Sequence, residues 1–271
     1  MTAAVNEGPL WLVGAGNMGG AMLRGWIAAG RDPATITVID PTAAGLPEGV
    51  LTLAAPPPDG AAPAVLVLAV KPQLLDAVAP VLAPMAAAET LLVSILAGVE
   101  IASLRARLPA PHTVVRAMPN LPAAIGRGVT ALFADTPTPD TRAMATGLVA
   151  PLGDVEWIDR EDMFDAVTAL SGCGPAFLFR FVEALAQAGE ALGLPAEQAA
   201  RLALATVEGS AIMAAAADVP PATLADRVAS PGGATREGLN VLDRGGAITA
   251  LLGETLAAAA RRSAELAAAA R

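Results

Sequence analysis

Leu10-Trp11-Leu12-Val13-Gly14-Ala15-Gly16-Asn17-Met18-Gly19 combines a short apolar run with three closely spaced glycines. Its first four residues are all apolar, as is typical of a strand buried on both faces of a parallel sheet. The three glycines have the spacing in which the first permits a tight turn, the second lets backbone approach a pyrophosphate, and the third lets a helix pack close to the strand. The stretch therefore predicts a strand, a dinucleotide-binding loop and the beginning of a helix.

Further apolar runs follow at the intervals expected of strands that alternate with helices. They are short, rich in Val, Ile and Leu, and lie at residues 36–39, 65–70, 91–95, 113–118 and 129–133. Residues 17–29 and 72–82, between some of these runs, carry apolar side chains at helical spacing. Strands and helices in alternation form parallel sheets with right-handed crossovers. We expect an α/β fold that begins with a Rossmann-like, doubly wound domain.

Asp40 ends the second expected strand, twenty-one residues after Gly19. An acidic residue at this place bonds the ribose hydroxyls of the adenosine half of a dinucleotide. Its charge would repel a 2′-phosphate, and no arginine follows closely, so it favours NADH. Thr42 could still donate to such a phosphate, which leaves NADPH open.

Lys71 is the only lysine of the chain and follows the expected strand at residues 65–70. Ligands bind at the carboxyl ends of strands in open α/β sheets, so this strand end is expected to line the cofactor. Pro72 then begins the next helix. A solvated lysine at a strand end is the alternative.

The character of the chain changes near Asp159, after which almost every segment has a helical period. We therefore expect a Rossmann-like domain at residues 1–158 and an all-helical domain at residues 159–271. Residues 167–185 and 202–213 are apolar around much of the helix, as interface helices are. This pattern predicts an oligomer.

Composition narrows the classes of function and location. The net charge is −9 and the pI is about 4.6, which disfavours nucleic-acid binding. No basic cluster adjoins an amphipathic stretch, and the first seven residues lack the features of a signal peptide, so we expect a cytoplasmic protein without a membrane partner. One cysteine and one histidine cannot build a zinc site, and no metal is expected.

Three stretches in the later part of the chain carry a more specific signal. A turn at Pro231-Gly232-Gly233 leads into a helix expected to begin near Thr235, and backbone N–H groups at such a helix start can hold an anion. Thr235 could cap that helix or donate to a substrate. A second stretch, residues 165–177, contains Ser171-Gly172-Cys173-Gly174-Pro175, which is expected to interrupt two apolar helices, either beneath the ligand or as a kink in an interface. The third is Val115-Arg116-Ala117-Met118-Pro119-Asn120-Leu121-Pro122.

Together with the glycine loop and Ala69-Val70-Lys71-Pro72, these stretches have the order and spacing found in pyrroline-5-carboxylate reductases, and the resemblance covers essentially the whole chain. It implies hydride transfer from NADPH or NADH to the imine of 1-pyrroline-5-carboxylate, giving L-proline. It also implies a helical domain that interlocks with that of a partner, and dimers that assemble into larger rings.

The resemblance also implies where the ligands bind. The substrate carboxylate would lie on Gly232, Gly233, Ala234 and Thr235, with Ser171 nearby. The residues expected at the cofactor are Val13, Gly14, Ala15, Gly16, Asn17, Met18, Gly19, Asp40, Ala69, Val70, Lys71, Pro72, Ala97 and Asn120.

The sequence departs from the family pattern at two positions. Cys173 stands where a second serine is usual, and we expect a small site-lining or core residue rather than a nucleophile, since imine reduction needs no covalent intermediate. Phe177 replaces a tyrosine, and the chain contains no tyrosine, which excludes a tyrosine proton donor. Catalysis is therefore expected to rest mostly on positioning, with Thr235 or a water near the imine nitrogen.

Two other functions fit parts of this pattern. One is a related reductase of another small cyclic imine or a 2-oxo acid, because the same architecture serves many reductases. The other is a cofactor-binding regulator without catalysis, although the intact stretch Ser230-Pro231-Gly232-Gly233-Ala234-Thr235 disfavours it.

Overall fold

The computed structural model describes residues 8–57 and 61–269, so the expectation about the first seven residues lies outside it. The chain forms two compact units, Met1–Cys173 together with Ala259–Arg271, and Gly174–Ala258. The expected division after residue 158 stays a prediction. Each unit is described by itself below.

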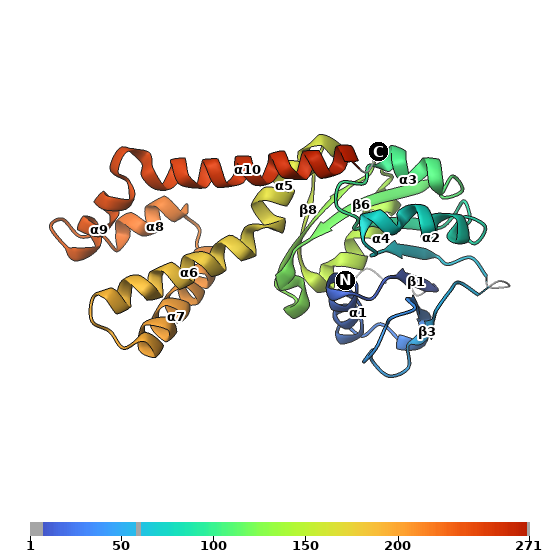
Figure 1. Cartoon of the computed structure of the whole chain (residues 1–271), viewed down its shortest axis with the longest axis horizontal. Coiled ribbons are helices and arrows are strands. Elements are labelled where there is room, and N and C mark those ends of the chain that lie inside the picture. The colour runs from blue at the N-terminus through green and yellow to red at the C-terminus, as the bar shows by residue number, and fades with distance from the viewer. Residues whose placement is uncertain (1–7, 58–60, 270–271) are drawn as a thin grey trace. The chain divides into compact units, whose positions relative to one another are not determined.

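The first unit is built on an eight-stranded sheet (Figure 1). Its strand order is β3-β2-β1-β4-β5-β6-β7-β8, and every pair is parallel except β6 with β7. The order reverses at β1, which pairs with β2 on one side and β4 on the other. The strands are β1 (Leu10–Val13), β2 (Ile36–Ile39), β3 (Leu51–Leu53), β4 (Val65–Leu68), β5 (Leu91–Ser94), β6 (Thr113–Pro119), β7 (Gly128–Phe133) and β8 (Gly153–Trp157).

Two of these strands were not expected from the sequence. β3 has only three residues, two of which are exposed, so it lacks an apolar run. β8 alternates exposed and half-buried residues at the edge of the sheet, and it reads Gly-Asp-Val-Glu-Trp. The antiparallel entry of β7 was not expected either. The doubly wound arrangement around β1 is confirmed.

Both faces of the sheet are covered because successive side chains of a strand point to opposite faces. Leu10 and Leu12 of β1 pack with α1 and α4, while Trp11 and Val13 pack with α2 and α3. The helices are α1 (Asn17–Ala28), α2 (Leu75–Leu82), α3 (Ile101–Arg107) and α4 (Pro139–Val149), with short turns η1 (Pro33–Thr35), η2 (Pro72–Leu74), η3 (Leu121–Ile125) and η4 (Ala150–Leu152).

The last sheet strand leads into a helical run that crosses from the first unit into the second. It consists of η5 (Glu161–Met163), α5 (Phe164–Val167), the π-helical turn η6 (Thr168–Gly172) and α6 (Gly174–Ala191). In the first unit Arg116 of β6 anchors this run, because its buried guanidinium lies 2.8 Å from Glu161 Oε1 and over the ring of Phe164. The start of the run is therefore fixed on the sheet.

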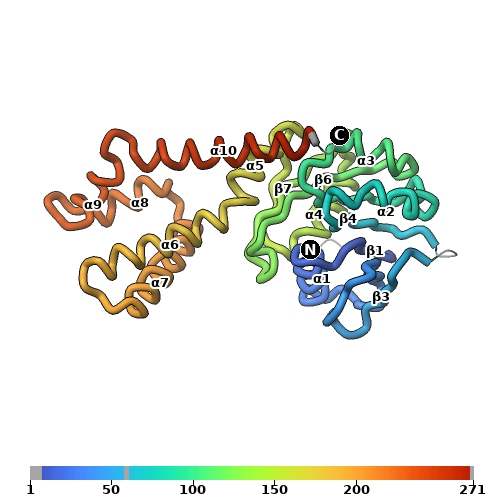
Figure 2. The backbone as a smooth tube through the Cα atoms, viewed as in Figure 1, coloured from blue at the N-terminus to red at the C-terminus, as the bar shows by residue number. Residues whose placement is uncertain are grey.

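The second unit is entirely helical, with α6 and α7 side by side (Figure 2). Its elements after α6 are α7 (Ala196–Ala215), α8 (Pro221–Arg227), α9 (Ala234–Leu242), η7 (Arg244–Gly246) and the first part of α10 (Ala247–Ala269). The final turns of α10 belong to the first unit, where Ser263 donates to Asp165 at 2.7 Å.

Candidate functional site

The strand register brings three site residues to one edge of the sheet. Val13 pairs with Ile39 on β2 and with Leu68 on β4, so Gly14, Asp40 and Ala69 follow side by side at the carboxyl ends of their strands. This is the point where the strand order reverses and where open α/β sheets bind ligands.

Gly14 is required at this point for two independent reasons. Its φ of 94° lies in the left-handed region that side chains disfavour. A Cβ there would also lie only 2.7 Å from the carbonyl oxygen of Ala69. Gly19 meets the same limit on the other side of the loop, because a Cβ on it would collide with the carbonyl oxygen of Gly14.

Gly16 differs from these two glycines because open space lies beside it. A Cβ on Gly16 would meet no atom within 4 Å. Gly16 is the N-cap of α1, with extended φ and ψ of −64° and −162°, and no side chain caps the helix. The first-turn N–H groups and the positive end of the helix dipole are therefore directed at a place that an anion could occupy.

The carboxylate of Asp40 is held by the glycine loop itself. The Ala15 N–H donates to Oδ2 at 2.8 Å, and the N–H and hydroxyl of Thr42 both donate to Oδ1 at 2.8 Å. Burial works to raise the pKa of Asp40, but these hydrogen bonds outweigh it and lower the pKa below its usual value. The residue is ionised, and the Thr42 hydroxyl is directed at it rather than at a ligand.

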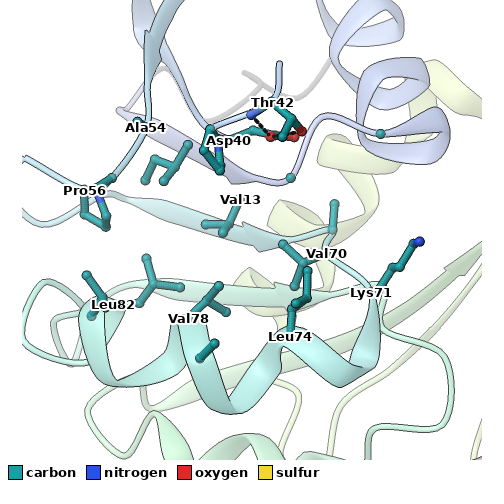
Figure 3. Close-up of a pocket in the computed structure, with 18 residues that line it drawn as sticks. Val13, Asp40, Thr42, Ala54, Pro56, Val70, Lys71, Leu74, Val78 and Leu82 are labelled. Atoms are coloured by element: carbon teal, nitrogen blue, oxygen red, sulfur yellow. Dashed lines mark hydrogen bonds between the residues drawn. The ribbon is translucent and has the colours of Figure 1, made fainter.

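A cavity of about 540 Å³ opens between the ends of β1, β2 and β4 and helix α2 (Figure 3). Its walls are mostly apolar, with Asp40 and Thr42 on one side and Lys71 on another. Of the expected cofactor residues it includes Val13, Gly14, Gly16, Asp40, Ala69, Val70 and Lys71. The remaining ones, Ala15, Asn17, Met18, Gly19, Pro72, Ala97 and Asn120, are not among its lining residues.

Sequence reasoning missed the outer walls of this cavity. Leu74, Val78 and Val81 come from η2 and α2, and Ala54 and Pro56 follow the short strand β3. The helical spacing of apolar residues at 74–82 could have indicated the α2 wall. One apolar stripe of that helix packs on the sheet, and the adjacent stripe faces the cavity. The wall that follows β3 could not be predicted, because a strand of three residues is too short to show a periodic pattern.

Asn120 and Ser171 meet at the end of β6, 51 residues apart in the chain. Asn120 Nδ2 lies 3.2 Å from the Ser171 carbonyl oxygen and 3.3 Å from Oγ, while its Oδ1 accepts the Val129 N–H at 2.8 Å. The interruption expected at residues 171–175 is a π-helical turn, with Cys173 N–H donating to the Thr168 carbonyl oxygen, and the helical run continues through it.

The stretch Ser230–Thr235 lies in the second unit as a tight turn before α9. Gly232 has a φ of 70°, and the Gly233 N–H donates to the Ser230 carbonyl oxygen at 3.0 Å. The helix begins at Ala234 with Gly233 as its N-cap and without a side-chain cap. The alternative in which Thr235 caps this helix does not hold, because the residue stands one position inside the helix, while its expected role at the substrate stays a prediction. Its hydroxyl lies on an exposed residue beside the first-turn N–H groups.

The second unit leaves much of its apolar surface uncovered in the single chain. α6 contains no buried residue, and Phe179, Phe181 and Ile212 are each about half exposed or more. Within the part of the chain that the structure describes, Glu161–Ala191 is the one helical run long and apolar enough to cross a membrane, by length and composition alone. Among the residues that the structure describes, no three or more His, Cys, Asp or Glu side chains lie close enough together to hold a metal ion.

Two separate parts of the chain match known families. Residues 161–266 match the family described as pyrroline-5-carboxylate reductase dimerisation. Residues 10–98 match the family described as NADP oxidoreductase, coenzyme F420-dependent. The first match covers the helical region and the second the glycine loop and the cavity.

Similar proteins span nearly the whole chain. A pyrroline-5-carboxylate reductase of Pseudomonas aeruginosa is 42% identical over 261 residues, covering 94% of this chain and 95% of the relative. One from Escherichia coli is 34% identical, covering 89% and 91%. The solved pyrroline-5-carboxylate reductase of Coxiella burnetii is 34% identical with a TM-score of 0.88, covering 96% and 99%. The pyrroline carboxylate reductase of Plasmodium falciparum, solved with NADP bound, is 26% identical with a TM-score of 0.84, covering 97% of this chain and 100% of that one.

Proposed function

The chain belongs to the pyrroline-5-carboxylate reductase family, and from that premise we propose how its residues divide the work of reducing 1-pyrroline-5-carboxylate to L-proline. It is an NAD(P)-dependent oxidoreductase that acts on a C=N bond. The main observation behind the proposal is the glycine loop, Gly14 to Gly19, which lies beside an apolar cavity where the strand order reverses.

The glycine loop and the cavity beside it fit a dinucleotide in three respects. The open space at Gly16 and the uncapped start of α1 suit a pyrophosphate. The ionised Asp40 retains lone pairs for ribose hydroxyls. The apolar walls from α2 suit a flat base. When bound, the reduced nicotinamide supplies the hydride, and Ala69, Lys71 and Ala97 lie at the strand ends we assign to its side of the site.

We assign the substrate to the turn Ser230–Thr235 and to Ser171. Backbone N–H groups at the start of α9 can hold the carboxylate, and glycines at 232 and 233 let it come close. The Thr235 hydroxyl is not used for capping, so it can donate to the substrate or hold a water near the imine nitrogen. A protonated imine is already electrophilic, so positioning supplies most of the rate.

Turnover by the wild-type protein tests the reaction itself. The absorbance of NADH or NADPH should fall only when pyrroline-5-carboxylate is present, and more slowly with other small imines and 2-oxo acids. A faster rate with one of those compounds would change the substrate assignment. Binding of the coenzyme without turnover of any imine would refute catalysis.

The role of Thr235 needs a separate pair of variants. Thr235→Ala should lower kcat/KM by about tenfold or more, as expected for the loss of one hydrogen bond to the reacting molecule, and Thr235→Ser should retain most of it. Thr223→Ala, an exposed threonine in the first turn of α8, is the matched control and should leave turnover unchanged. A wild-type kcat/KM in Thr235→Ala would refute the assignment.

The chain oligomerises through its helical region, as the family match to a dimerisation domain indicates. We propose a homodimer, assembled further into a ring of dimers, in the cytoplasm, with no nucleic-acid or membrane partner. The uncovered apolar side chains of α6 and α7 support the dimer, because a single chain would leave them in water. A monomer mass in light scattering at micromolar concentration would contradict the proposed dimer.

A further inference from the structure

Both ends of the Asn120 amide are hydrogen-bonded to protein groups. The Val129 N–H can only donate, so it identifies Oδ1 of Asn120 as the oxygen and fixes the amide orientation. Nδ2 then donates to Ser171, and the nitrogen lies 3.2 Å from the carbonyl oxygen and 3.3 Å from Oγ. Asn120 is only 8% exposed, so little of it is available to a ligand.

The Ser171 carbonyl needs this donor because of the sequence that follows it. In an α-helix it would accept from the N–H four residues later, but that residue is Pro175, which has none. The π-helical turn Thr168–Gly172 already departs from α-helical pairing at the same place. Asn120 supplies, from the end of β6, a donor to the Ser171 carbonyl in place of the N–H that Pro175 lacks.

The same amide also determines what the Ser171 hydroxyl can do. Because Oγ accepts from Nδ2, its own proton points away from Asn120 and is free to donate elsewhere. We propose that Asn120 is a positioning residue that holds Ser171 as a hydrogen-bond donor to the substrate carboxylate, rather than a residue that touches the cofactor. This inference rests on the proposed function, within which Ser171 binds substrate.

A double-mutant cycle in the full-length enzyme tests the proposal. Asn120→Ala should raise the KM for pyrroline-5-carboxylate about tenfold, the usual effect of losing one buried hydrogen-bond partner. Ser171→Ala should have a similar effect. The double variant should be no worse than either single variant, because the two residues act as one unit. The Kd of NADH, measured by fluorescence, should change by less than about twofold in all three.

Thr90→Val is the matched structural control. Thr90 is also buried and also bonds two backbone groups, the Pro63 carbonyl and the Ala87 N–H, but it lies at the opposite end of the strands. This variant should lose stability without raising the KM. A loss of substrate affinity confined to the Asn120 and Ser171 variants then separates positioning from general destabilisation.

Several results would overturn the proposal. Additive effects in the double variant, about a hundredfold together, would show that the two residues act independently. A loss of NADH affinity equal to the loss in kcat/KM would make Asn120 a direct cofactor contact. A normal KM in Asn120→Ala would remove its role altogether. Wild-type protein that fails to reduce pyrroline-5-carboxylate would instead refute the proposed function, before any variant is compared.

Discussion

Replacing Asp40 with asparagine should shift coenzyme preference from NADH towards NADPH. Asp40 lies in the wall of the cavity at the end of β2, and its hydrogen bonds to Ala15 and Thr42 keep it ionised. A ribose hydroxyl can bond such a carboxylate, whereas a 2′-phosphate at the same place meets a like charge. The Thr42 hydroxyl already donates to Asp40, so it offers the phosphate little compensation.

Coulomb's law gives the size of this effect. Two unit charges about 5 Å apart repel by about 1 to 3 kcal/mol between the dielectric of water and that of a protein surface. Salt at physiological strength leaves most of this, because the Debye length of about 8 Å is longer than the separation. Removing the charge should therefore raise the NADPH/NADH ratio of kcat/KM by about 5- to 150-fold.

The substitution also has a structural cost that must be separated from specificity. One oxygen of the carboxylate becomes an amide nitrogen, which faces either the Ala15 N–H or the Thr42 N–H and cannot accept from it. We expect a loss of about 1 to 3 kcal/mol of unfolding free energy. Because both coenzymes bind the same weakened loop, this cost lowers both kcat/KM values and cancels in their ratio.

Steady-state kinetics with both coenzymes at fixed pyrroline-5-carboxylate measure the ratio, and urea unfolding measures the stability. Asp32→Asn is the matched control, since Asp32 is an exposed carboxylate that also accepts a backbone N–H, from Ala34, and its loss changes the net charge equally. The ratio should not move in that variant. An unchanged ratio in Asp40→Asn, or a shift towards NADH, would refute the electrostatic reasoning.

Three further predictions concern the packing, charge and assembly of the chain. Ala267→Leu should cost about 1 to 3 kcal/mol of unfolding free energy, because the site is tightly packed and a Cβ on Gly98 would already lie 2.9 Å from the Ala267 Cα. It should also weaken NADH binding, because Gly98 follows Ala97, which we assign to the cofactor. Ala268→Leu, on the exposed side of α10, should have neither effect. Burial works to raise the pKa of Asp135, but the ion pair with Arg105 outweighs it and lowers the pKa. This pair should therefore stabilise the folded state fully above about pH 4 and lose that effect as the pH falls through the lowered pKa. Asp135→Asn should make the unfolding free energy from urea titrations depend less on pH in that acid range. Phe181→Arg, on the uncovered face of α6, should shift light scattering towards the monomer, and an unchanged mass would contradict that assignment of the interface.

Much of the fold could be predicted because its signals are local. Strand runs such as Leu10–Val13 and Ile36–Ile39 are continuous and apolar, since both of their faces are buried by helices. The strands β3 and β8 lie at the two edges of the sheet, where little burial is required, and so they carry no such runs. β7 was predicted as a strand from its apolar run, but its antiparallel direction was not predicted, because such a run looks the same in a strand of either direction.

The glycine loop, the acid at the end of the second strand and the separated motifs of the family could all be predicted from the sequence, because each depends on residue type at fixed spacing. The hydrogen-bond partners of these residues could not be predicted, because the tertiary fold sets them. The carboxylate of Asp40 is held by Ala15, 25 residues earlier, and Asn120 is held to Ser171, 51 residues later. Sequence spacing cannot report such contacts, because the register of the sheet and the path of the helical run bring the partners together. The glycine loop was readable at once for the opposite reason, since its constraint lies between neighbouring residues.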